Sequence, residues 1–228
     1  MYWYLDPTYV LVIIGALVCA FASLNVNSTY KKYERYGNAR GITADQCAAE
    51  ILRLAGINDV RIERIGGHLT DHYDPSKKVL RLSSSIYGST SVAALGIAAH
   101  ECGHAIQHNV AYAPLKLRTL SVPLANIGSK LAFPIIILGI IFGAMDIARI
   151  GVFFFVFVVL FQLITLPVEF NASARAITIL DRCSFLSGGE LTGAKKVLKA
   201  AALTYVAALF SSILQLLRLV ILTGGRDE

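Results

Sequence analysis

Two histidines four residues apart, with a glutamate directly after the first, lie in the stretch AAHECGHAIQH. In an α-helix such a spacing places both side chains on one face with Cβ atoms about 5–6 Å apart, so His100 and His104 can bind one metal ion. Zinc accepts imidazole nitrogens at about 2.0–2.1 Å. Glu101 lies where its carboxylate can take a proton from a water that the ion polarises. The HExxH pattern therefore predicts metal-assisted hydrolysis with Glu101 as the base.

The alternative for the two histidines is a structural role, in which they form hydrogen bonds inside a packed core. The motif lies among alanines in a strongly apolar chain, where an unpaired buried glutamate is costly unless a cation compensates it. A metal site is therefore favoured. Ligand type alone does not separate zinc from another divalent ion.

A catalytic zinc ion usually has three protein ligands and one open position, so a third ligand is needed. His108 lies two helical turns from His100, about 12 Å along the axis, which is too far for one ion; we interpret it as a rim or packing residue. Glu169 is the best candidate, because it follows an apolar stretch where the chain returns to the histidines' side of the membrane. The alternative is an ordinary glutamate at a membrane boundary.

The remaining histidines and the cysteines form no second metal pattern. His68 and His72 are also four apart, but they lie among turn and strand residues, where that spacing does not align side chains. We interpret them as loop histidines, with substrate contact as the alternative. The cysteines contain no CxxC pair and are expected to be reduced, at positions Cys19, Cys47, Cys102 and Cys183.

The composition indicates a membrane protein. Of 228 residues, 55% are hydrophobic and 16% are charged, with a mean hydropathy of +0.60, whereas about 25% of residues are charged in an ordinary soluble domain. Four apolar stretches are candidate membrane spans. They cover residues 8–24, 131–145, 150–168 and 202–222, and the last is the weakest because it contains Gln215 and Arg218.

The middle two stretches predict a helical hairpin, with its tight turn at residues 146–149 and a kink at Pro134. We expect a new helix to begin near Glu169. The first stretch could instead be a cleaved signal peptide, since Ala20-Phe21-Ala22 resembles a cleavage site. However, no basic region precedes it, so a retained anchor is favoured.

The distribution of positive charge predicts the orientation in the membrane. Eighteen of the 21 Lys and Arg residues lie in segments 25–130 and 169–199, which the positive-inside rule places in the cytoplasm. We therefore expect a multi-pass protein of the cell membrane with its site facing the cytoplasm. The net charge of +6 needs no nucleic acid to explain it, and the sequence identifies no protein partner.

The predicted fold is a mainly α membrane protein with about four transmembrane or membrane-embedded helices and a small α+β unit. In that unit we expect a helix from Thr43 to Gly56, a strand at 60–65, a second strand at 77–83 exposed at a sheet edge, and a helix that runs from a serine cap to Pro114. The predicted segments are an N-terminal anchor (1–30), a cytoplasmic segment with the HExxH helix (31–130), a transmembrane hairpin (131–168), a cytoplasmic helix with the third ligand (169–199) and a C-terminal membrane helix (200–228).

The sequence resembles the YugP-like membrane zinc metallopeptidases, which belong to the gluzincin class and are similar in plan to the HtpX-type membrane proteases. The resemblance rests on DHYDPSKKVLRLSSSIYGSTSVAALGIAAHECGHAIQH, the apolar hairpin and PVEFNASARA, in that order. It implies that one zinc ion is bound by His100, His104 and Glu169, that Glu101 is the base, and that the reaction is peptide hydrolysis.

The resemblance also concerns the residues around the ligands. HtpX-type enzymes carry an acid four residues after the ligand glutamate, where this chain has Ser173, so the role of orienting a ligand histidine would pass to Asn171 or Ser173, or be absent. The strand VLRLS would bind an extended peptide by edge pairing. Arg175 would stabilise a developing oxyanion, or would be a solvated helix arginine.

The predicted function is an integral-membrane zinc endopeptidase that cleaves polypeptides at the cytoplasmic face of the bilayer. One alternative is an intramembrane protease of the site-two type, but that type has a distal Asp-Gly ligand motif, and this chain contains no Asp-Gly dipeptide. The other is a non-catalytic membrane scaffold or metal-binding protein. Glu101 argues against it, because a structural zinc site needs no base.

Overall fold

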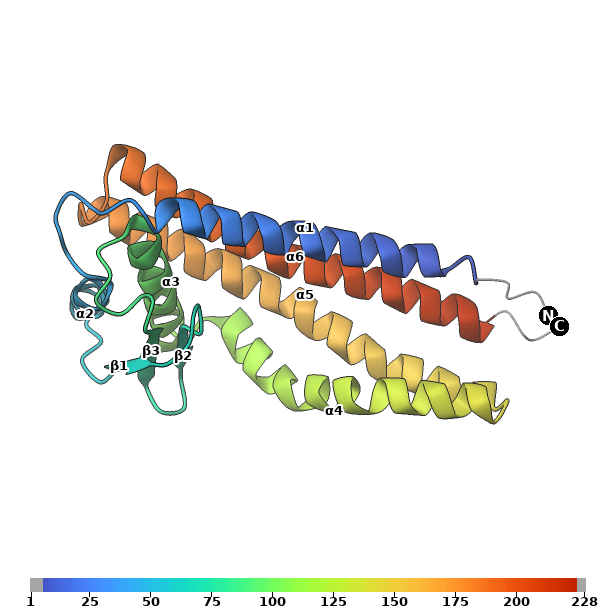
Figure 1. The fold of residues 1–228 in the computed structure, drawn as a ribbon. Coiled ribbons are helices and arrows are strands. Elements are labelled where there is room, and N and C mark those ends of the chain that lie inside the picture. The colour runs from blue at the N-terminus through green and yellow to red at the C-terminus, as the bar shows by residue number, and fades with distance from the viewer. Residues whose placement is uncertain (1–5, 225–228) are drawn as a thin grey trace. The chain divides into compact units, whose positions relative to one another are not determined.

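The computed structural model describes residues 6–224, and within them the chain is mainly helical (Figure 1). Among these residues, four helices are long and apolar enough to cross a membrane, as predicted. The elements in order are α1 (Tyr9–Tyr33), α2 (Ala44–Leu54), β1 (Arg61–Ile65), β2 (His72–Asp74), β3 (Val79–Ser83), α3 (Val92–Asn109), α4 (Ala113–Ile141), α5 (Met145–Arg182) and α6 (Gly188–Gly224).

The chain divides into two compact units. The apolar unit comprises the described parts of Met1–Ser23, Lys116–Leu166 and Leu203–Glu228. The mixed unit comprises Leu24–Leu115 and Pro167–Ala202, and it contains α2, α3 and the whole sheet. Every residue predicted to take part in the chemistry lies in the mixed unit.

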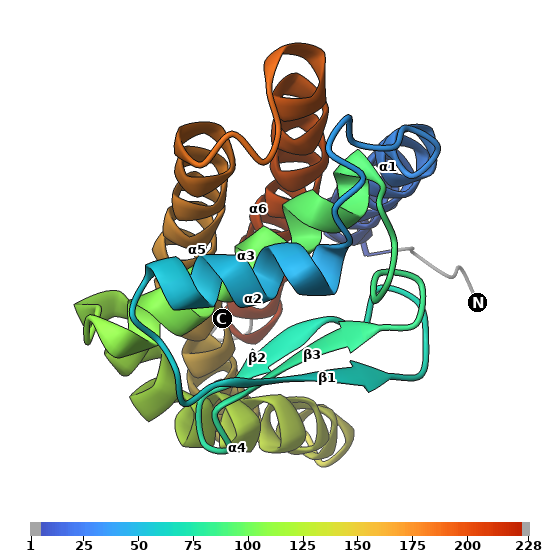
Figure 2. The same cartoon turned by 90° about the vertical axis from the view of Figure 1, so that its left-hand side faces the viewer.

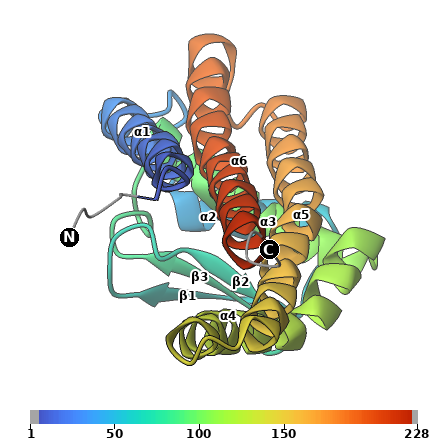
Figure 3. The same ribbon diagram turned by 90° about the vertical axis from the view of Figure 1, so that its right-hand side faces the viewer.

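The helices of the apolar unit are drawn end-on in Figure 3, and small residues let them approach closely. A Cβ on Gly15 of α1 would lie 2.6 Å from the Ser211 hydroxyl oxygen of α6, and one on Gly151 of α5 would lie 2.8 Å from the Ala132 carbonyl oxygen of α4. Such small-residue contacts are typical of membrane helices, which pack without a hydrophobic driving force. The sequence predicted a hairpin here, and the structure shows that its helices α4 and α5 are closely packed.

The turn of this hairpin lies earlier than predicted. Residues 142–144 form it, and Gly143 supplies a positive φ of 69°. The predicted turn at 146–149 was wrong, because these residues already belong to α5. Asp146 lies in the first helical turn, where a negative charge is favourable, and it pairs with Arg149 three residues later.

The long helices extend well beyond the apolar stretches. α4 begins at Ala113, contains Pro123 and Pro134, and is bent in Figure 1. The prediction that a new helix begins near Glu169 was wrong, because α5 continues through Pro167 without a break. Hydropathy identifies only the apolar part of a helix. A polar sequence that contains alanine, such as NASARA, also has helical propensity and extends α5 beyond its apolar part.

The sheet has the order β1-β3-β2, with β1 parallel and β2 antiparallel to β3 (Figure 2). The prediction that VLRLS lies at an exposed edge was wrong, because β3 is the central strand and its Val79, Leu80 and Leu82 are fully buried. The strand β2 is only three residues long and gave no sequence signal. It is an edge strand of the sheet, whereas β3 is not, and both strands contact α3.

The helices of the mixed unit begin at the predicted caps. Thr43 and Gln46 form a capping box at α2, and Gly56 follows its end with a φ of 70°. Ser91 caps α3 by accepting from the backbone N–H of Ala94. The predicted continuation of α3 to Pro114 was wrong: the helix ends at Asn109, because Ala111 adopts a positive φ.

Candidate metal centre

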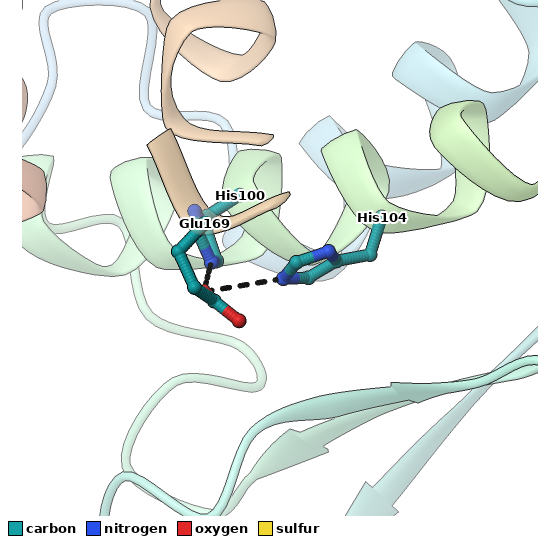
Figure 4. A group of neighbouring side chains, drawn as sticks. All are labelled: His100, His104 and Glu169. Atoms are coloured by element: carbon teal, nitrogen blue, oxygen red, sulfur yellow. Dashed lines mark hydrogen bonds and ion pairs between the residues drawn. The ribbon is translucent and has the colours of Figure 1, made fainter. Parts of the chain in front are cut away.

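The structure brings together the three residues predicted as metal ligands. Nε2 of His100 lies 3.2 Å from Oε2 of Glu169, and Nε2 of His104 lies 3.5 Å from the same oxygen (Figure 4). The ligand atoms all lie within 4.8 Å of one another. The histidines come from α3 and the glutamate from α5, 69 positions after His100.

Glycine and alanine residues allow α3 and α5 to meet at this point. A Cβ on Gly103, within the HExxH motif, would lie 2.6 Å from the backbone oxygen of Ala172. Ala172 and Ala176 are fully buried on the same face of α5 as Glu169. The motif therefore positions the site in two ways, because its histidines supply nitrogens and its glycine lets the third ligand approach.

The separations between these atoms fit a zinc ion. Bonds of about 2.0–2.1 Å in a tetrahedral arrangement place ligand atoms about 3.3 Å apart, close to the observed 3.2 and 3.5 Å. The outer nitrogen of each ring already has a partner: Nδ1 of His100 lies 3.1 Å from the Ser173 hydroxyl, and Nδ1 of His104 lies 3.0 Å from Oε1 of Gln107. Both Nε2 atoms are thus directed at the carboxylate.

The charge balance of the site also favours a cation. Glu169 is only 3% exposed. Burial raises the pKa of its carboxyl group, but hydrogen bonds from His100 and His104 outweigh burial and hold that pKa well below its usual range. Burial lowers the pKa of His104, whereas its hydrogen bond to Glu169 and the charge of Glu101 raise it, with a net increase. A buried carboxylate that stays ionised needs positive charge beside it.

Glu101 is 8% exposed and is held by the sheet. Its Oε2 accepts a hydrogen bond of 2.9 Å from the backbone N–H of Tyr73, on the edge strand β2. This contact fixes the carboxylate next to the ligand group. Sequence reasoning missed Tyr73, because its contribution comes from the backbone and its strand has no readable periodicity.

The three residues predicted around the ligands lie on one stretch of α5. The hydroxyl of Ser173 contacts His100 directly. Oδ1 of Asn171 accepts from Nε2 of Gln107 at 3.0 Å and from Nε of Arg175 at 2.8 Å, and the Arg175 guanidinium lies over the ring of Tyr112. Gln107 was also missed, although its position three residues after His104 on α3 places it on the same helical face.

The other histidines lie outside the ligand group, as expected. Nδ1 of His108 lies 2.9 Å from the Tyr73 hydroxyl, and both residues line a cavity of about 240 Å³ beside the sheet. The His68 ring packs on Tyr30, and His72 contacts Arg81. Within residues 6–224, the group of His100, His104 and Glu169 is the one cluster of at least three such side chains close enough to hold a metal ion.

Comparison with known proteins agrees with this chemistry. Residues 8–224 match the model of a family described as "Putative neutral zinc metallopeptidase". The chain is 43% identical over 222 residues to the "Putative membrane protease YugP" of Bacillus subtilis (strain 168). The aligned region covers 96% of this chain and 99% of that protein. The resemblance to the YugP-like proteins is thereby confirmed. No solved structure matches the chain. By the extent of these matches, the chain belongs to this family of zinc metallopeptidases.

Proposed function

We propose that the protein is an integral-membrane zinc endopeptidase in which His100, His104 and Glu169 hold one zinc ion and Glu101 is the general base. The proposal is carried by the convergence of two Nε2 atoms on one carboxylate oxygen at 3.2 and 3.5 Å. Membership of a zinc metallopeptidase family supports the metal and the reaction class. The combination of a small sheet, an HExxH helix and a later glutamate corresponds to a gluzincin plan.

The side chains have separate tasks in peptide hydrolysis. A zinc ion held by His100, His104 and Glu169 would act as a Lewis acid toward a water molecule and the substrate carbonyl. Glu101 accepts the proton of the attacking water and transfers it to the departing amine. The backbone N–H of Tyr73 holds the Glu101 carboxylate in place for both transfers. Ser173 and Gln107 keep the ligand nitrogens of the two histidines facing Glu169.

We propose a polypeptide substrate bound in extended form along β2, instead of along β3 as the sequence suggested. Both sides of β3 are paired, whereas β2 pairs with β3 on one side only. The backbone of β2 also reaches Glu101 through Tyr73. A peptide beside this strand would therefore have main-chain partners next to the base.

The proposed location is the cell membrane, with the site on the cytoplasmic side. The four long helices supply the spans, and the name of the Bacillus relative agrees with a membrane protease. The predicted segments (1–30, 31–130, 131–168, 169–199 and 200–228) give the order of anchor, soluble segment, hairpin, soluble helix and last membrane helix. The excess of Lys and Arg in segments 25–130 and 169–199 supports their cytoplasmic placement.

The ligand count favours an enzyme over a metal-binding scaffold. A structural zinc site is closed by four protein ligands, whereas a catalytic site keeps one position open. Among residues 6–224, three side chains form the candidate group. Three protein ligands would leave one coordination position of a zinc ion for water, and Glu101 directly follows the ligand His100 in the sequence. Both are features of a hydrolytic site.

Metal analysis combined with the variant Glu101→Gln tests the proposal on the purified full-length protein. We expect one zinc ion per chain in both proteins, and hydrolysis of an unfolded protein substrate about 10²–10⁴-fold slower in the variant. Glu50→Gln, on the exposed surface of α2, is the matched control. Unchanged hydrolysis by Glu101→Gln would refute the assignment of Glu101 as the base. Absence of zinc from the wild-type protein would refute the proposed zinc site.

A further inference from the structure

A chain of hydrogen bonds in which every donor and acceptor can be assigned leads from Arg175 to His104. The Arg175 guanidinium contains only donors, and its Nε donates to Asn171 at 2.8 Å. The Asn171 atom that receives this bond must be its oxygen, since the amide NH₂ group in that place would set two donors against each other. The side-chain amide of Asn171 therefore has a single permitted orientation.

Two acceptors determine the orientation of Gln107, whose side chain is fully buried. One end of the Gln107 amide lies 3.0 Å from Oδ1 of Asn171 and 2.8 Å from the backbone oxygen of Val168. Both of these atoms are acceptors, so the end that faces them is the NH₂ group. The other end, Oε1, then faces Nδ1 of His104 at 3.0 Å.

We infer that Gln107 is a positioning residue that holds His104 in the tautomer with hydrogen on Nδ1 and a lone pair on Nε2. An amide oxygen can only accept, so Nδ1 of His104 must donate to it. The Nε2 atom, which faces Glu169, carries a hydrogen only when the ring is charged, and in the neutral ring its lone pair is available to a cation. The inference rests on the proposed zinc site, and it adds a buried amide that selects the binding-competent form of one ligand.

His100, the other proposed ligand histidine, is not restricted to one tautomer in this way. Its Nδ1 contacts the Ser173 hydroxyl, and a hydroxyl group can donate as well as accept. Ser173 therefore orients the ring of His100 without determining which nitrogen carries the hydrogen. Replacing Gln107 is therefore expected to weaken zinc binding more than replacing Ser173.

The zinc dissociation constant of the purified full-length protein in detergent, measured by competition with a chelator of known affinity, tests the inference. Gln107→Leu should bind zinc about 10–100-fold more weakly, as is typical when a partner of a ligand histidine is removed. Gln162→Leu is the matched control in α5, because its side-chain oxygen has no hydrogen-bond partner among the described residues. Wild-type affinity in Gln107→Leu would overturn the inference, whereas a wild-type protein without zinc affinity would overturn the proposed function.

A second pair of variants separates the tautomer effect from packing and tests the chain of hydrogen bonds through Asn171 even if Gln107→Leu does not fold. Asn171→Asp keeps an acceptor for both neighbours and should bind zinc close to the wild-type value, whereas Asn171→Leu should bind it several-fold more weakly. The unfolding temperature of the zinc-free proteins reports packing separately. Equal zinc affinities in the two Asn171 variants would overturn the role of Asn171 in the inferred chain of hydrogen bonds, whatever their unfolding temperatures.

Discussion

Nε2 of His100 on α3 lies 3.2 Å from Oε2 of Glu169 on α5, although the two residues are 69 positions apart. The contact exists because α5 continues as a helix past Pro167 and therefore projects Glu169, Ala172 and Ser173 from one face. All three residues follow Pro167, so the helical spacing of α5 after the proline places their side chains together. The ligand group thus depends on helical spacing in α5 as much as on the HExxH spacing in α3.

The first prediction concerns the third ligand. Glu169→Ala removes one of three ligands and leaves both Nε2 atoms without their shared carboxylate, so zinc affinity should fall by at least about 100-fold. Zinc content after dialysis and chelator competition measure the effect. Glu50→Ala, an exposed glutamate on α2, should retain full zinc content. A Glu169→Ala protein with normal zinc content would show that the third ligand is another residue.

The second prediction concerns the close approach of α3 and α5. A methyl group on Gly103 would lie 2.6 Å from the backbone oxygen of Ala172, so Gly103→Ala forces the helices apart. Overpacking costs about 1–3 kcal/mol, more than the helix propensity of about 1 kcal/mol that alanine gains over glycine. We expect lower stability and weaker zinc binding, measured by thermal unfolding and chelator competition.

Gly96→Ala is the control for Gly103→Ala, because both change a glycine of α3 to alanine. A Cβ on Gly96 would meet the Cβ of Ala194 at 3.4 Å, which is an ordinary contact. This variant should bind zinc normally and gain up to about 1 kcal/mol of stability. Equal losses of zinc binding in the two variants would show that the Gly103 contact has no special role.

The third prediction separates the histidine that contacts Tyr73 from the proposed ligands. His108→Ala loses a hydrogen bond to the Tyr73 hydroxyl at the rim of a cavity, so the zinc content should stay at the wild-type value. His104→Ala should abolish stable zinc binding. Metal analysis of the two purified proteins measures the difference. Zinc loss in His108→Ala would mean that α3 contributes a ligand from its last turn.

The sequence predicted those parts of the site that follow from local periodicity. His100, Glu101 and His104 are related by helical spacing, and Glu169 was placed on their side by hydropathy and charge. The position of β3 was mispredicted, because alternation identifies a strand but not its neighbours, and β2 is too short to show alternation. Gln107 and Tyr73 were missed because their roles depend on contacts between elements, namely the amide with α5 and the β2 backbone with Glu101.

The last prediction concerns membrane topology. If α4 and α5 cross the bilayer as a hairpin, Phe142 in its turn, which is 77% exposed, should lie on the outer face, and Ser187 between α5 and α6 should lie in the cytoplasm. A membrane-impermeant maleimide should label Phe142→Cys in intact cells and Ser187→Cys only after permeabilisation. The background protein carries serine at the half-buried Cys19 and Cys183, since Cys47 and Cys102 are fully buried. Labelling of Ser187→Cys in intact cells would reverse the orientation and place the metal centre outside the cytoplasm.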